Sequence, residues 1–132
     1  GESEGQPLSA LTIIAAITDG PIDLTRRAAN IAVTTAAGNV DARIVSIGTS
    51  EEEHVFSTDI GNAGQMYMRN LDLTNYVEWG PTTGAYPFKL NPGATGSKGG
   101  PPTLLQLAPG ATSIFLRSNT AACRVEIYIH EA

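Results

Sequence analysis

The residues that could carry out acid–base or metal chemistry are few in this sequence, and they lie far apart. The two histidines, His54 and His130, fall on different predicted strands, so no metal-ligand spacing such as H-x-x-x-H is present. Three consecutive glutamates, residues 51–53, precede His54 and could hold a cation through their carboxylate oxygens. Because this run lacks the alternating ligands of a calcium loop, we interpret it as a solvated turn. We predict no metal and no cofactor.

Sequence signatures of catalysis are also missing, because the chain contains no G-x-S-x-G elbow, no P-loop and no dinucleotide fingerprint. An active site would have to assemble from titratable residues on distant strands. The candidates for such a site are Glu51, Glu53, His54, Asp59 and His130. We predict that the chain is not an enzyme, and convergence of these residues in one pocket is the observation that would favour the enzyme alternative. The single cysteine, Cys123, can form no intrachain disulfide, and we expect it to be buried.

The charge balance bears on the partners that the chain could bind. It has 8 basic and 13 acidic residues and a net charge of −5, whereas binding to a phosphate backbone requires clustered Lys and Arg. No segment approaches the ~20 consecutive apolar residues of a membrane helix. We therefore predict neither nucleic acid nor a membrane as a direct partner. Charged residues make up only 16% of the chain, which predicts a largely neutral surface that other subunits could cover.

Short runs of β-branched and aromatic residues alternate along the chain with clusters of Gly, Pro, Asn, Asp and Ser. In the clearest run, Val125, Ile127 and Ile129 alternate with polar residues, as in a half-buried antiparallel strand. Strands are predicted at residues 11–17, 31–35, 43–47, 54–57, 65–71, 76–79, 86–90, 103–107, 113–117 and 124–130. The fold class is therefore all-β, with eight to ten short strands arranged as an antiparallel two-sheet sandwich.

Length and composition predict the organisation of the domain. The 132 residues match the usual size of one domain, so we expect a flexible arm at residues 1–10 and a single sandwich domain at residues 11–132. Six glycines and prolines break up residues 93–102, which predicts an exposed loop. The arm and this loop supply candidate protein contacts: Gly1, Glu2, Gly96, Lys98 and Gly99.

Three turns are predicted from local chemistry. Residues 90–95 and 107–112 share the pattern L-x-P-G-A-T, in which Pro-Gly suits the central positions of a type II turn. Because the flanking sequences differ, we interpret the two copies as shared turn chemistry rather than as a duplication. Residues 72–75, with the sequence D-L-T-N, are predicted to close a hairpin between two strands.

Four segments form an ordered series that resembles a known type of protein. They are M-R-N-L-D-L-T-N-Y-V-E-W-G at 68–80, Y-P-F-K-L-N-P-G at 86–93, L-Q-L-A-P-G at 105–110 and V-E-I-Y-I at 125–129. The series is similar to a group of small tailed-phage structural proteins with the pattern R-N-L-D-x-T-N-Y-V-E-x-G, F-x-K-L-x-P-G, L-x-L-x-P-G and V-E-Y-x-I. The resemblance spans about residues 43–131 and leaves the N-terminal third and the 93–102 insertion unmatched.

This resemblance implies a jelly-roll-like sandwich located in the virion, where it would act as a capsid decoration (cement) protein or a tail accessory protein. The implied partners are the major capsid protein or tail proteins, and the implied assembly is a homo-oligomer, with a trimer expected. Tyr76, Trp79 and Tyr86 are candidate contact residues, although strand aromatics also fill sheet faces in cores. The alternative is a tail- or fibre-associated carbohydrate-binding module in which Trp79, with Tyr76 or Tyr86, stacks on sugar rings.

Overall fold

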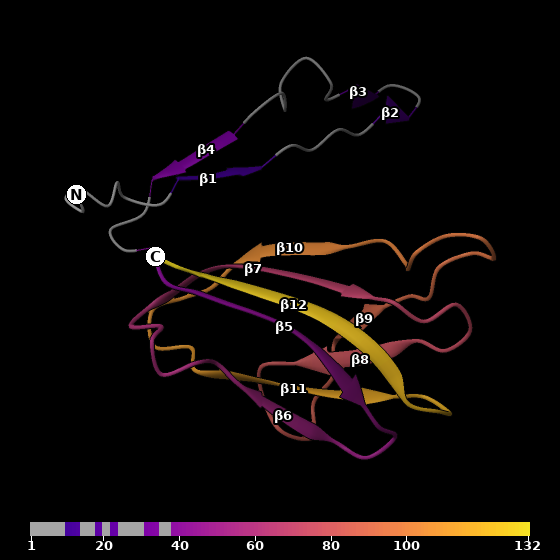
Figure 1. Cartoon of the computed structure of the whole chain (residues 1–132). Helices are drawn as coiled ribbons and strands as arrows, with labels where there is room; N and C mark the ends of the chain where they lie inside the picture. The colour runs from indigo at the N-terminus through magenta and orange to yellow at the C-terminus, as the bar shows by residue number, and fades with distance from the viewer. Residues whose placement is uncertain (1–9, 14–17, 20–21, 24–30, 35–37) are drawn as a thin grey trace. The chain divides into compact units, whose positions relative to one another are not determined.

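The structure of the chain is a computed structural model that describes residues 10–13, 18–19, 22–23, 31–34 and 38–132 (Figure 1). Every regular element in these ranges is a strand, and every strand pair is antiparallel. The chain divides into two units, residues 1–38 and residues 39–132, which are described separately.

The first unit contains two small ribbons. Strand β1 (Ala10–Ile13) pairs with β4 (Ile31–Thr34), and β2 (Thr18–Asp19) pairs with β3 (Ile22–Asp23). Nearly all of the expected N-terminal arm, residues 1–9, lies outside the described residues. The expected division into an arm and one domain therefore stays a prediction.

The second unit is built from two four-stranded sheets, which form separate layers in Figure 1. The β12 sheet has the order β10-β7-β12-β5, from β10 (Thr103–Gln106), β7 (Ala63–Asn70), β12 (Cys123–Glu131) and β5 (Val40–Ile47). The β11 sheet has the order β6-β11-β8-β9, from β6 (Glu52–Val55), β11 (Ser113–Ser118), β8 (Val77–Gly80) and β9 (Phe88–Leu90). The predicted antiparallel two-sheet sandwich is confirmed.

The order of the strands gives this sandwich a jelly-roll connectivity. From β5 to β12 the chain changes sheet at every connection except the one between β8 and β9, which are hydrogen-bonded neighbours. The first, eighth, third and sixth of these strands form one sheet, and the second, seventh, fourth and fifth form the other. This strand order is that of a jelly roll, in which eight strands form two Greek-key motifs.

Alternation along each strand selects the side chains that fill the space between the sheets. On β12, Val125, Ile127 and Ile129 are buried, and Ile127 and Ile129 lie opposite Met68 and Met66 of β7. The β11 sheet contributes buried side chains that include Val77, Trp79, Leu90, Ile114 and Leu116. Cys123 is buried as expected. The alternating pattern of the sequence thus becomes one continuous apolar core.

The connection at residues 72–75 differs from its prediction. Residues 72–75 join β7 of one sheet to β8 of the other, so the predicted hairpin is wrong, because these strands do not pair with each other. The Asx-turn chemistry itself is present, since Asp72 Oδ2 accepts hydrogen bonds from the amides of Thr74 at 2.9 Å and Asn75 at 2.6 Å.

Of the two predicted Pro-Gly turns, only the second forms a type II turn. Gly110 has a φ of +94°, and the Ala111 amide donates to the Ala108 carbonyl at 3.3 Å, as a type II turn requires. Gly93 is not among the glycines with positive φ in the described part of the chain, and its amide donates to Asp72 O at 2.9 Å. The type II turn at residues 92–93 is therefore a wrong prediction.

Candidate functional site

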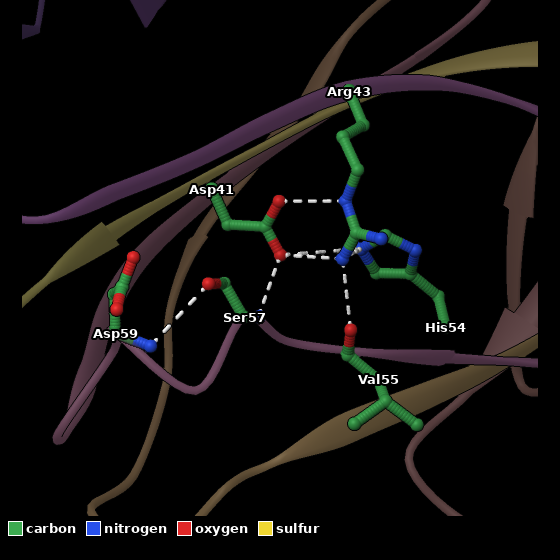
Figure 2. A network of polar contacts seen from close by, with 6 residues as sticks. All are labelled: Asp41, Arg43, His54, Val55, Ser57 and Asp59. Carbon is green, nitrogen blue, oxygen red and sulfur yellow. Dashed lines mark hydrogen bonds and ion pairs between the residues drawn. The ribbon is translucent and has the colours of Figure 1, made fainter.

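A cluster of polar groups, of which Asp41 and His54 are buried, joins the two sheets where β5 and β6, the edge strands on one side of the sandwich, face each other (Figure 2). Alternation along β5 places Asp41 and Arg43 on the inward-facing side of the strand. Arg43 donates from Nε to Asp41 Oδ1 and from Nη2 to Asp41 Oδ2, both at 2.7 Å. The same Nη2 reaches the other sheet and donates to Val55 O at 2.8 Å. A bidentate ion pair on β5 is thereby tied to the backbone of the opposite sheet.

The same cluster contains the three residue types of a hydrolytic triad, but their geometry is structural. His54 Nε2 lies 3.8 Å from Asp41 Oδ2 and 3.4 Å from Arg43 Nη2. Ser57 contributes its backbone amide, which donates to Asp41 Oδ2 at 2.9 Å, while its hydroxyl oxygen accepts from the Asp59 amide at 3.3 Å. An activated serine requires a hydrogen bond between its hydroxyl and the histidine. The cluster serves to hold the sheets together.

Burial and charge act in opposite directions on the titratable groups of this cluster. Burial works to raise the pKa of Asp41, but hydrogen bonds from Arg43 and from the Ser57 amide outweigh it and hold that pKa below its usual value. Burial lowers the pKa of His54, and the nearby Arg43 charge lowers it further against an opposing effect of Asp41. At neutral pH, the cluster therefore consists of a carboxylate, a guanidinium and an uncharged imidazole.

The glutamates that precede His54 serve a second structural contact. Glu51 Oε2 accepts from Thr83 Oγ1 at 2.6 Å, and Glu51 Oε1 accepts from the Gly84 amide at 2.8 Å and from the Tyr86 hydroxyl. The hydrogen bonds from Thr83, Tyr86 and Gly84 lower the pKa of Glu51. Glu52 accepts from the Gly48 amide. No group of three or more potential metal ligands gathers within the described ranges.

The residues considered for a catalytic site lie in separate places. Glu51 binds the loop between β8 and β9, and His54 belongs to the inter-sheet cluster. Glu53 is exposed on β6. Asp59 uses its backbone in a turn, and His130, on β12, has its Nδ1 2.7 Å from the Glu131 carbonyl oxygen. The structure does not bring these five side chains together in one site.

The segment 93–102, which was predicted to be an exposed loop, is exposed only in part. Gly96 and Lys98 are exposed at its tip, but Gly99 and Gly100 are buried. Arg69 Nε donates to Gly100 O at 2.8 Å, and the Gly100 amide donates to Asn70 O at 2.8 Å. Gly99 is therefore a correction to the predicted contact residues, because the base of the loop packs against the end of β7. Gly1 and Glu2 lie outside the described residues.

Residues 68–80, one of the segments that resemble phage proteins, include the end of β7. We call the region around Asn70, at this end of β7, the corner of the sandwich. Asn70 is fully buried, and its Nδ2 donates to Asn75 O at 2.8 Å and to Leu90 O at 3.1 Å. Its Oδ1 accepts from the Asp72 amide at 2.9 Å. One side chain thus ties the β7–β8 connection to the end of β9, which gives the R-N-L-D-L-T-N segment a structural role.

The candidate aromatic contacts are less available than the sequence suggests. Trp79 is only 2% exposed and packs against Phe88 with ring centroids 4.6 Å apart, so it is a core residue and not a surface contact. Arg117 lies over the Tyr86 ring and Lys89 over the Tyr76 ring, each 4.3 Å from the ring centroid. The stacking platform of the carbohydrate-binding alternative therefore lacks its tryptophan.

The outer face of the β12 sheet offers an apolar surface. Leu104, Tyr67, Tyr128 and Ala42 lie in register across all four strands, from β10 to β5. Because their neighbours along each strand point into the core, this row points outward. We call these four residues the outer row.

Ile44, which is 51% exposed, lies beside the outer row, and the Tyr67 hydroxyl donates to Glu126 Oε1 at 3.1 Å. A shallow hollow of about 360 Å³ lies along this part of the face, lined by Ala42, Arg43, Ile44, Tyr67, Glu126, Ile127 and Tyr128. The alignment of Tyr67 and Tyr128 with Leu104 and Ala42 could not be predicted from the sequence, because it depends on which strands are neighbours.

None of the described residues belongs to a helix long and apolar enough to cross a membrane. In comparisons with known proteins, no family model, no curated protein and no solved structure matches this chain.

Proposed function

We propose that this chain is a virion structural protein of the capsid decoration, or cement, type, which binds other virion proteins and stabilises the shell through those contacts. The proposal rests on the ordered segments between residues 68 and 129 that resemble small tailed-phage structural proteins. The jelly-roll sandwich is compatible with it. A fold of this kind hosts many functions, however, so the surface must carry the argument.

The observation that carries the proposal is the outer row on the β12 sheet. An exposed face of an antiparallel sheet usually presents polar side chains to water. Here Leu104, which is 44% exposed, and Ile44 flank two half-buried tyrosines on that face. Aromatic and aliphatic side chains surrounded by polar groups are typical of surfaces that bind another protein.

The polar groups of the sandwich support the same view. The Asp41 carboxylate, the Glu51 carboxylate and the Asn70 amide are each held by several hydrogen bonds within the chain. These groups stabilise connections between strands and loops. The proposed partners are therefore protein surfaces, namely the major capsid protein or tail proteins, together with other copies of this chain.

Co-sedimentation of the full chain with isolated phage capsids, and separately with tail tubes, tests the proposal. We expect the chain to sediment with one of these particles in a saturable manner. Replacing Leu104→Lys should weaken binding at least about tenfold, because burial of a leucine side chain contributes roughly 1.5–3 kcal/mol and a buried lysine opposes it.

Leu73→Lys is the matched control, since Leu73 is 43% exposed but lies in the β7–β8 connection, outside the outer row. This variant should bind as the unmodified chain does. Failure of the unmodified chain to bind any particle, or equal binding by the Leu104→Lys variant, would count against the proposed role.

A further inference from the structure

Among the described strands of the sandwich, β5 is the longest of the four edge strands. β5 ends the strand order of the β12 sheet, and its eight residues include neither glycine nor proline. The other edge strands carry features that discourage pairing: β6 has Glu52 and Glu53, β9 has three residues and follows Pro87, and β10 follows Pro101 and Pro102. β5 carries the charges Asp41 and Arg43, but its eight residues make it twice as long as β6 or β10, so it offers the longest edge to another strand.

Exposed apolar residues gather at this edge. Six large hydrophobic residues are exposed in the part of the chain for which burial is described, and three of them are Val40 at 41%, Ile44 at 51% and Val55 at 55%. Val40 and Ile44 are on β5 itself. Val55 is adjacent on β6, because its carbonyl oxygen accepts a hydrogen bond from Arg43. Water-exposed apolar groups concentrated beside the edge of a sheet favour a contact with another chain.

We propose that β5 pairs with β5 of a second copy of this chain, antiparallel about a two-fold axis at Ala42. In this register Ala42 lies opposite Ala42 of the second copy, and Val40 lies opposite Ile44 of the second copy. Asp41 then lies opposite Arg43 of the second copy. Both apolar residues and both charges of the strand find suitable partners, as a self-complementary two-fold contact requires.

The charges of Asp41 and Arg43 favour the register centred on Ala42 over other registers of the same strand pair. Inward-facing charged residues on an edge strand discourage pairing with arbitrary strands. A second β5 in the proposed register supplies the opposite sign at each of these positions, whereas a register centred on Arg43 would bring two guanidinium groups together. The Arg43 side chain is 46% exposed and the Asp41 side chain 3%, so the guanidinium is the part of each ion pair that a second copy would meet.

Disulfide trapping tests the register directly. Opposing residues of an antiparallel pair have Cα atoms roughly 4.5–5.5 Å apart, a distance that a disulfide spans. The full chain with Ala42→Cys should form covalent dimers rapidly under mild oxidation, with little background from the buried Cys123. Ser46→Cys is the matched control on the same exposed side of β5, because two copies of residue 46 would lie roughly 27 Å apart.

Light scattering during size-exclusion chromatography tests the contact itself. The unmodified chain should elute as a dimer, and Ile44→Lys or Val40→Asp alone should raise the dissociation constant at least tenfold. The double variant, Val40→Asp with Ile44→Lys, should regain the dimer in a salt-dependent manner, since each aspartate would face a lysine of the other copy. Leu73→Lys, in the β7–β8 connection, should leave the dimer intact.

A monomer or a trimer at concentrations of tens of micromolar would overturn the inference, as would equal cross-linking of the two cysteine variants. These outcomes are distinct from failure of the proposed virion role. A dimer that ignores every particle retains the β5 contact and contradicts the virion role. A monomer that binds capsids through the outer row does the reverse.

Discussion

Replacement of Asn70 by alanine should destabilise the sandwich more than almost any other single polar substitution. Asn70 is fully buried at the end of β7, and its side chain makes three hydrogen bonds. Two of them hold the carbonyl oxygens of Asn75 and Leu90, and the third holds the amide of Asp72. Alanine keeps the strand geometry but leaves these backbone groups without their partner.

The size of the effect follows from the hydrogen bonds. Each bond contributes about 0.5–1.5 kcal/mol net, and each buried group left unsatisfied adds to the loss. We therefore expect Asn70→Ala to lower the free energy of unfolding by about 4 kcal/mol. With a urea m-value of about 2 kcal/mol/M, the midpoint of unfolding should fall by about 2 M.

Urea unfolding followed by Trp79 fluorescence is a suitable assay, because Trp79 lies in the core of the same sandwich. Asn91→Ala is the matched control, since Asn91 is an exposed asparagine beside the same corner, and it should change stability by less than about 0.5 kcal/mol. If Asn70→Ala unfolds within 1 kcal/mol of the unmodified chain, the corner is not held by this side chain and the reasoning fails.

Three further predictions concern pH, backbone geometry and the tryptophan. The folded chain holds the pKa of His54 below its unfolded value of about 6.5. The stability that this group contributes is therefore present above that pH and is lost as the pH falls toward the lowered pKa. The urea midpoints at pH 7 and pH 5 should differ less in the His54→Gln variant than in the unmodified chain. Gly100→Ala should destabilise more than Gly110→Ala, because a Cβ at Gly100 would overlap a backbone oxygen whereas Gly110 has open space and only a positive φ; thermal melts of the two variants check this. Emission from Trp79 should be blue-shifted and unchanged across a glycan panel, and a shift with any glycan would revive the carbohydrate-binding alternative.

The sequence predicted the strands well because their signal is local. All ten predicted strands have a counterpart in the structure, including β12, where alternation runs through Val125, Ile127 and Ile129. The ribbon of β2 and β3 was missed, because two-residue strands are too short to show a period.

Connections between strands were less predictable. The Asp72 side chain forms the predicted Asx turn, yet the chain crosses there to the other sheet. The turn chemistry is the same whether the next strand pairs with the previous one or with another. The two L-x-P-G-A-T segments have the same turn chemistry, but only the second forms a type II turn. In the first, the Gly93 amide instead donates a hydrogen bond to Asp72 O.

Part of the inter-sheet cluster could have been predicted from the sequence. Asp41 and Arg43 occupy the same face of β5 as Val45 and Ile47, so two charges stand at inward positions of an apolar pattern. A predicted strand that began at Arg43 hid this alternation. The partner of the pair, Val55 on β6, depends on how two sheets stack and could not be predicted locally.

The most direct test of the central claim, that this sandwich works through protein contacts on its outer row, is a density map of an assembled particle that contains the chain. We expect the map to place the row from Leu104 to Ala42 against a neighbouring virion protein. A map in which this face is open to solvent would contradict the account.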